Sequence, residues 1–251
     1  MKEKLKYLIN KKAFHVSIFI FIITIILFTV GIIFLKYSVE GETNMPFVLN
    51  KIVIISSVEG IDKEAGENRW AFDVGQNNDI NLYIEKNKNY DKQDAIKSIL
   101  IDNINIQRNS EKGTINLYRP NTTDSGVYFR NVEDNLVKTL EYKGAMQTDL
   151  KNLEISNQGG LIMFRVANDK IAEYISNDDE INHNELLKKS NITVEDLKLK
   201  LSMDVTIKIE SGKEYKANIE LDLPIEGVIE KGTSSQEIID KSDIIFKRIK
   251  N

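Results

Sequence analysis

The densest group of side chains that could do chemistry lies between residues 178 and 185. It contains four carboxylates and one histidine, in the order Asp178, Asp179, Glu180, His183 and Glu185. Carboxylate oxygens beside an imidazole can bind a divalent metal ion. The neighbouring asparagines favour an exposed acidic loop instead, so these five residues are only weak candidates for a metal site. No cofactor is expected elsewhere.

Nucleophilic catalysis has little support in the sequence. A Ser-His-Asp triad would have to use His183, the only histidine outside the apolar segment near the N-terminus, but no G-x-S-x-G turn is present. The chain has no cysteine, which excludes thiol catalysis, disulfide bonds and Cys-ligated zinc. Walker A, dinucleotide-binding and H-E-x-x-H motifs are also missing. We therefore predict that the protein is not an enzyme.

A calcium-binding loop is a further hypothesis. Asp73, Asn77 and Asp79 have part of the spacing of such a loop. The EF-hand pattern requires Gly at the position of Asn78 and Glu at the position of Ile84, so the match fails at two points. A polar turn is the favoured interpretation of this stretch.

Other candidates are less specific. A pair of carboxylates could cleave a glycosidic bond, but 37 acidic residues follow position 12 and the sequence selects no pair among them. Tyr118–Asn121 and the single tryptophan, Trp70, could belong to a binding surface. For Trp70, a position in the core is favoured.

The elements that position these residues are mainly β-strands. Every second residue is apolar from Leu197 to Ile209 and again from Tyr215 to Leu223. A helix would spread such a pattern around its axis, so period two predicts strands with one buried face. The two runs are joined by a turn that contains Gly212, and we predict a long antiparallel hairpin.

Other apolar runs predict further strands. Ile52–Ile55 suits a central strand, and Trp70–Val74 and Ile80–Ile84 flank Gly75–Asp79, a stretch typical of a loop. Two more pairs of short strands flank Gly113 and Gly159-Gly160, and we predict that each pair is a hairpin. Their similar spacing could indicate a repeat. The strands of these two pairs are expected at 104–106 with 115–117 and at 153–155 with 162–166.

Two short helices are predicted, and a third is one of two possibilities for the tail. Asp91–Ile101 has an N-cap residue and apolar residues at helical spacing, and His183–Lys189 could form two turns. In the tail from Ser234 to Lys250, Ser234 and Glu237 fit a capping box. Ile244–Phe246 could equally form a final strand, and both possibilities stay open.

Ala13–Leu35 is a run of 23 residues without a charge. A helix of this length spans about 34 Å, enough to cross a hydrocarbon core of about 30 Å. The run is longer than the apolar part of a cleaved signal peptide, and Val39–Gly41 is a poor cleavage site. We therefore predict a transmembrane signal anchor and a contact with the lipid bilayer through residues 13–35.

Charge predicts the orientation of this anchor. Residues 1–12 contain five lysines and one glutamate, whereas residues 13–251 have 29 basic and 37 acidic residues, a net charge of −8. The positive-inside rule keeps the basic tail in the cytoplasm and exports residues 36–251. The acidic excess of the exported part argues against nucleic-acid binding.

The stretch from Val39 to Val58, together with Trp70, resembles uncharacterised single-pass, membrane-anchored extracytoplasmic proteins of low-GC Gram-positive bacteria. The resemblance implies a location at the cell membrane and an exported domain, and it implies no activity or site residues.

The sequence thus predicts one transmembrane helix followed by a mainly β, antiparallel, sandwich-like region with a few short helices. The predicted divisions are a tail at 1–12, an anchor at 13–35 and a β-rich region at 36–251, which could divide into two subdomains near 145. The expected function is a tethered binding or assembly module of the cell envelope, with another envelope or membrane protein as partner. An anchored hydrolase of carbohydrate or peptide and a ligand- or metal-binding sensor subunit remain alternatives.

Overall fold

The structure, a computed structural model, contains two compact units. One is formed by the N-terminal helix and the other by Thr43–Ile249. The residues that the structure describes are 2–39, 45–90, 92–122, 127–147, 153–240 and 243–249.

Helix α1 runs from Lys2 to Val39. Its segment His15–Ile33 is long and apolar enough to span a membrane, and within the described residues no other helix has these properties. The hydroxyl groups of Thr24 and Thr29 donate to the carbonyl oxygens of the residues four positions earlier, at 2.9 and 2.8 Å. Their hydrogen-bonding groups are thus satisfied inside the helix, as an apolar environment requires.

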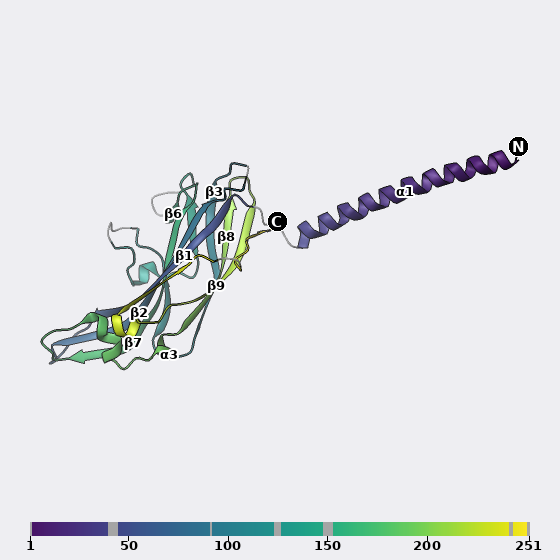
Figure 1. Ribbon diagram of the computed structural model, residues 1–251. Helices are drawn as coiled ribbons and strands as arrows, with labels where there is room; N and C mark the ends of the chain where they lie inside the picture. The colour runs from purple at the N-terminus through teal and green to yellow at the C-terminus, as the bar shows by residue number, and fades with distance from the viewer. Residues whose placement is uncertain are drawn as a thin grey trace. The chain divides into compact units, whose positions relative to one another are not determined.

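The second unit is a sandwich of two β-sheets, which confirms the predicted fold class (Figure 1). Every described strand pair is antiparallel except β5–β6. Sheet A has the order β10-β1-β2-β7-β4, with the bounds Thr233–Ile238, Phe47–Asp62, Trp70–Lys86, Gly160–Ser176 and Thr114–Tyr118. Sheet B has the order β11-β9-β8-β3-β5-β6, with the bounds Lys247–Ile249, Glu214–Asp222, Leu199–Ile209, Ile96–Arg108, Leu140–Gly144 and Leu153–Ile155.

The predicted hairpin is confirmed as β8 and β9. Their pairing runs from Lys200 opposite Asp222 to Lys208 opposite Glu214. Buried residues alternate with more exposed ones along both strands. Gly212 has a φ of +85° in the connecting turn, a conformation that glycine adopts without strain.

The main core lies between the sheets. The inward faces of sheets A and B bury one continuous apolar cluster, and the largest fully buried side chains belong to it almost entirely. Members from both sheets include Phe47, Ile80, Phe164, Ile99, Val205, Ile219 and Tyr215.

Short helices cover the part of sheet A that carries a second apolar cluster. Phe72 and Val74 of β2 pack there with buried residues of the helical segments, such as Leu186. The helical segments are η2 (His183–Glu185), α2 (Leu186–Lys189), α3 (Val194–Leu197) and α4 (Val228–Lys231). Helical turns at 183–189 were predicted and are confirmed.

The predicted helix at Asp91–Ile101 is wrong. Residues from Ile96 onward form β3, which pairs with β8 on one side and with β5 on the other. Ile96, Ile99 and Ile101 are fully buried. The apolar spacing was compatible with a short helix or a strand, and pairing in the sheet decides between them. Asp91 itself lies outside the described residues.

The predicted loop at Gly75–Asp79 is also wrong. These residues lie in the middle of β2, where Gln76 and Asn78 are fully buried. Ser56 Oγ and Gln76 Nε2 donate to Asn78 Oδ1 at 2.6 and 3.3 Å, and Asn78 Nδ2 donates to Val166 O at 3.2 Å. The amide of Asn78 is thus satisfied inside the sheet, whereas Gln76 Oε1 is buried without a hydrogen-bond partner among the described residues. The local irregularity is a bulge in the β2–β7 register between Val74 and Gln76.

Neither of the two predicted glycine-centred hairpins forms. β3 and β6 belong to sheet B, whereas β4 and β7, which follow them in the chain, belong to sheet A. Each glycine-containing connection therefore crosses between the sheets. A hairpin and a connection between two sheets have the same strand–turn–strand pattern in the sequence. The pattern does not show which sheet the second strand joins.

The tail contains two short strands. β10 pairs with β1, and β11 pairs with β9, so the capping-box helix from Ser234 is wrong within the described residues. Ile244–Phe246 is not a strand either, since the last strand begins at Lys247. Phe246 is buried in the main core.

We expect Val205→Asp to lower the free energy of unfolding by about 3–5 kcal/mol, because it buries an unpaired carboxylate in the main core. Val205 is fully buried between Ile101 and Ala217. Thr206→Asp is the matched control, since residue 206 faces outward opposite Lys216, and it should change the value by less than about 1 kcal/mol. Chemical unfolding of the full chain in detergent measures both. Equal stabilities would contradict the core assignment.

Candidate functional site

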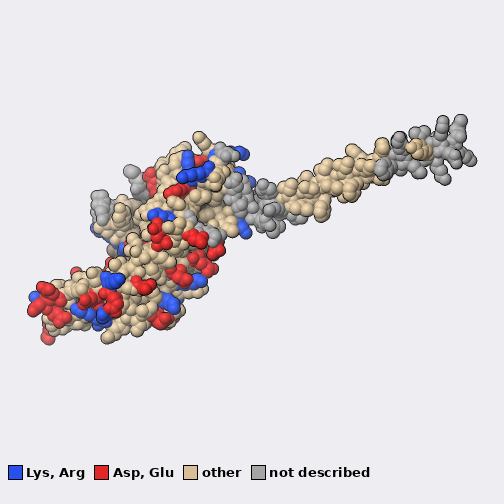
Figure 2. Space-filling model, in the orientation of Figure 1, with Lys and Arg blue, Asp and Glu red and all other residues tan. Residues whose placement is uncertain are grey.

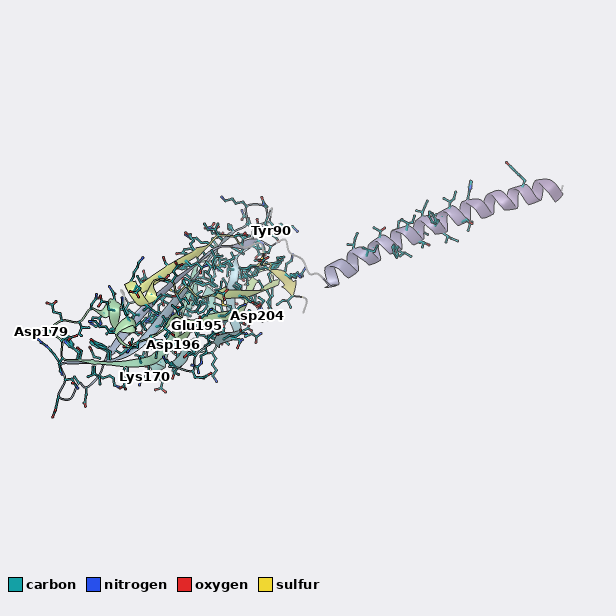
Figure 3. The ribbon with its side chains drawn as sticks, turned by 60° about the horizontal axis from the view of Figure 1, so that its bottom comes forward. Tyr90, Lys170, Asp179, Glu195, Asp196 and Asp204 are labelled. Atoms are coloured by element: carbon teal, nitrogen blue, oxygen red, sulfur yellow. The ribbon has the colours of Figure 1, made fainter. Side chains whose placement is uncertain are left out.

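The five candidate metal ligands lie near one end of sheet A, and four of them contact different neighbours. Figure 3 shows Asp179 at the end of the sandwich farthest from Tyr90. Asp179 forms an ion pair with Arg69, and Asp178 accepts a hydrogen bond from Tyr174 at 3.5 Å. Figure 2 shows that Lys and Arg side chains lie among the Asp and Glu side chains at the end where β2 begins and β7 ends.

His183 is an exposed side chain that packs against an aromatic ring. Its ring lies edge-on to Phe72, with centroids 5.1 Å apart. Glu185 lies 3.9 Å from Lys189, and Glu180 is exposed. Among the residues described, no group of three or more His, Asp or Glu side chains is arranged to hold a metal ion.

The candidate calcium ligands are spread along β2. Asp73 Oδ1 lies 3.1 Å from Lys63 Nζ, and Asp79 pairs with Arg165 at 2.6 Å. Asn77 donates to Glu59 at 2.6 Å. Extended backbone separates alternate residues by about 6.6 Å, so these side chains do not converge on one ion.

In both candidates for a binding surface, an aromatic side chain makes contacts inside the protein. Tyr118 is 5% exposed, and its hydroxyl group donates to Asp169 Oδ2 at 2.8 Å. Burial, reinforced by this carboxylate, raises the pKa of Tyr118 well above its usual value. Trp70 stacks on Phe72 with centroids 6.2 Å apart, and its Nε1 donates to Asp178 O at 2.9 Å.

On one side of the sandwich, part of strand β3 has no strand partner, a feature that the sequence did not predict. We call this the open side. β3 pairs with β5 only from Ser98 to Ile101, whereas it pairs with β8 as far as Arg108. Among the described strands, none pairs with Ile104–Arg108 on the β5 side. We call these five residues the β3 edge.

A β-bulge at Asn103 determines which side chains of the β3 edge face the interior. The register of β3 against β8 contains one extra residue there, and Asn103 has a left-handed φ of +50°. Before the bulge, Ile99 and Ile101 are in the core. After it, Ile104 and Ile106 are half-buried and pack against the same core. Because of the extra residue, the core-facing side chains have odd residue numbers directly before the bulge and even residue numbers after it.

Asp204 on β8 holds this bulge in place. Its carboxylate accepts hydrogen bonds from Asn103 Nδ2 at 2.8 Å, Asn218 Nδ2 at 2.9 Å and Lys216 Nζ at 2.8 Å. These bonds, with Asn103 contributing most, lower the pKa of Asp204 to about 2. Asp204 is labelled in Figure 3.

The opposite wall of the open side comes from β4 and the chain that follows η1 (Glu133–Asn135). Ile115 and Leu117 are the inward-facing residues of β4. Val137 N donates to Leu117 O at 3.0 Å, so residues 136–138 extend along β4 before the chain enters sheet B as β5.

These two walls enclose a groove of about 580 Å³. Most of its lining is apolar, and the exceptions are Asn116 and Lys138. Lys138 is exposed, and it has no ion pair with any residue that the structure describes. The lining residues are Ile104, Ile106, Ile115, Asn116, Leu117, Leu136, Val137 and Lys138.

Residues 127–135, the cover segment, hold the groove wall against sheet A. Asn131 Nδ2 lies 2.8 Å from Glu59 Oε2, 2.9 Å from Asn77 Oδ1 and 3.3 Å from Asp169 Oδ1. Arg165 Nη1 donates to Asn131 Oδ1 at 3.0 Å. Polar side chains on the outward face of sheet A thus hold Asn131, and with it the cover segment, in position.

Arg165 is the centre of this anchorage. Its Nε and Nη2 donate to the two carboxylate oxygens of Asp79 at 2.6 and 3.0 Å. Its guanidinium carbon lies 4.7 Å from the ring centroid of Phe129, which is itself buried. A bidentate pair with a stacked aromatic ring gives the cover segment a defined position.

The loop between β3 and β4 is fixed from the other side by Asp196 of α3. Asp196 accepts hydrogen bonds from Lys112 Nζ at 2.9 Å and Ser110 Oγ at 3.0 Å, and it completes a capping box with Thr193. These bonds, led by the one from Lys112, hold the pKa of Asp196 well below its usual value. Both ends of the groove wall are therefore positioned by polar contacts.

Comparisons with known proteins do not assign this groove. No protein-family model matches the chain, and no curated protein or solved structure is significantly similar to it. Its interpretation rests on its own geometry, which suits the binding of an apolar group, and its lining contains no carboxylate or histidine among the described residues.

We expect the stability of the protein to fall as the pH decreases from about 4 to about 2, and part of this fall depends on Asp204. Its folded-state pKa is depressed, so its contribution is present above the unfolded-state pKa and is lost as the carboxylate becomes protonated. Asp204→Asn removes this contribution, on the order of 2 kcal/mol. Urea unfolding of both proteins at pH 6 and pH 2 measures the difference. A difference in stability that does not change with pH would contradict the role of the charge.

Proposed function

We propose that the protein is a membrane-anchored, extracytoplasmic binding module that holds another envelope protein through the groove. The observation that carries this proposal is an apolar groove of about 580 Å³ on the open side of the sandwich. Large exposed apolar residues occur on the cover segment and its extension, namely Val127, Tyr128, Val132 and Leu136, and of these Leu136 lines the groove. Apolar patches of this kind are typical of interaction surfaces.

The N-terminal helix supports the membrane part of the proposal. Residues 15–33 have the length and composition of a membrane span. Five lysines precede the span, and Glu40 and Glu42 follow it. The positive-inside rule then places the tail in the cytoplasm and the sandwich outside the membrane.

The arrangement of charges favours binding over hydrolysis. A hydrolase acting on carbohydrate or peptide needs acidic or nucleophilic groups facing its substrate. Among the described residues that line the groove, Lys138 is the one with a charged side chain. Asp79 and Asp169, on the outer face of sheet A, are bonded to Arg165 and Tyr118, in contacts that hold the cover segment and β4.

Topology is testable because the chain has no cysteine of its own. Tyr7 and Ser235 are exposed, and each can be replaced by cysteine in the full chain. A membrane-impermeant maleimide added to intact cells should label Ser235→Cys and should label Tyr7→Cys only after the membrane is permeabilised. Labelling in the reverse order would contradict the proposed orientation.

Binding at the groove can be tested by photocrosslinking in intact cells. Leu136 and Ile55 are both 42% exposed, but only Leu136 lines the groove. We expect Leu136→Cys, labelled with a maleimide–benzophenone, to give a discrete adduct with another protein, and Ile55→Cys to give none.

A second substitution gives the control for this experiment. Adding Ile106→Lys to Leu136→Cys should remove the adduct, because it places a charge in the groove. Adding Gln107→Lys should retain it, since Gln107 is exposed and does not line the groove. Equal adducts from Leu136→Cys and Ile55→Cys, or none from either, would contradict the proposed function.

A further inference from the structure

The groove is bordered by a strand with an unpaired side. The β3 edge, Ile104–Arg108, has a strand partner on the β8 side and none on the β5 side among the residues described. Five residues of extended chain measure about 17 Å. Backbone N–H and C=O groups on such an edge can pair with an added strand.

The sequence of this edge offers little protection against pairing. Charged residues, proline and inward-pointing charges are the usual means of blocking an edge strand. Between Asp102 and Arg108 the strand contains only Asn, Ile and Gln. The bulge at Asn103 lies before the β3 edge, and the register with β8 is regular from Asn105 to Arg108.

We propose that the occupant of the groove is an extended segment of another protein, which adds to sheet B as a strand along the β3 edge. It would continue the position that β5 occupies beside Ser98–Ile101. Alternate apolar side chains of the segment enter the groove between Ile104 and Ile106 on one wall and Leu117 on the other. This inference rests on the proposed function and names its mode of binding.

The chemistry of the groove favours a strand over other occupants. A helix satisfies its own backbone groups, and an acyl chain has no donors or acceptors, so neither would pair with the β3 edge. An added strand supplies both the backbone partners and apolar side chains at a spacing of two residues.

Lys138 favours a negative charge on the incoming segment. Its ammonium group is exposed on the rim, and it has no ion pair within the described parts of the chain. A carboxylate on the incoming segment would complement it. The segment we infer therefore has alternating apolar residues and an acidic residue near one end.

The test uses the full chain in lipid nanodiscs and a fluorescent peptide with the sequence Thr-Ile-Thr-Ile-Thr-Val-Thr-Glu. Fluorescence anisotropy, with empty nanodiscs as the blank, should show saturable binding. Two control peptides have the same composition, one with its apolar residues in a single block and one with N-methylated backbone amides. Both should bind about tenfold more weakly or worse, because one loses the alternation and the other the backbone donors.

Substitutions in the chain test where the peptide binds. Ile106→Lys should weaken binding about tenfold, and the matched Gln107→Lys should not. Lys138→Glu should weaken binding several-fold, and a peptide ending in Lys instead of Glu should restore it. Lys97→Glu, on β3 but away from the groove, is the control for this charge reversal. Hydrogen exchange should show new protection at residues 104–108 when the peptide is bound.

Two results would overturn the strand model. One is equal binding of the alternating, block and N-methylated peptides, which would indicate an apolar site without backbone pairing. The other is the absence of peptide-dependent protection at residues 104–108, including the case in which no peptide binds. If Leu136→Cys still captures a protein in cells, the binding function stands and only the strand mode fails. If it does not, both fail.

Discussion

β2 and β7 of sheet A contain 17 residues each, whereas β8 and β9, the hairpin of sheet B, contain 11 and 9. A sheet face that carries apolar side chains must be covered, and sheet B supplies cover for only part of the long strands. Beyond it, the second apolar cluster forms under the short helical segments, with Leu186 and Val228 against Phe72. This difference in strand length accounts for the two apolar clusters. β5 begins only at Leu140, opposite Ile101, and this leaves the β3 edge without a strand partner on that side of the sandwich.

Two of the register irregularities, one in β7 and one in β3, contain a residue with a left-handed backbone. In β7, Lys170 adopts a left-handed φ of +56° where the register with β2 shifts, and in β3, Asn103 does so where the register with β8 shifts. A left-handed conformation costs free energy for most residues other than glycine. At Asn103 the hydrogen bond to Asp204 offsets part of this cost. As a consequence, the same strand contributes to the core before the bulge and to the groove after it.

The sequence predicted the parts of the fold in which a local pattern has one interpretation. The alternation along Leu199–Ile209 predicted its strand, and the uncharged run before residue 36 predicted the helix. Prediction failed at Gln76 and Asn78, since amide side chains can be satisfied in a turn or by one another inside a sheet. The groove was not predictable, because Ile104–Ile106 and Ile115–Leu117 were recognised as strands, but their assignment to different sheets depends on contacts distant in sequence.

The charged residues also divide into two classes, and this division bears on function. Arg165, Asp79 and Asp169 are bonded to neighbours that fix the cover segment and β4. Lys138, at the end of that wall, has no such partner in the described structure and remains exposed beside apolar residues. A wall fixed by polar groups, with an exposed charge at its rim, would suit the proposed binding, because rigidity limits the entropy lost on association and a charge can select a partner.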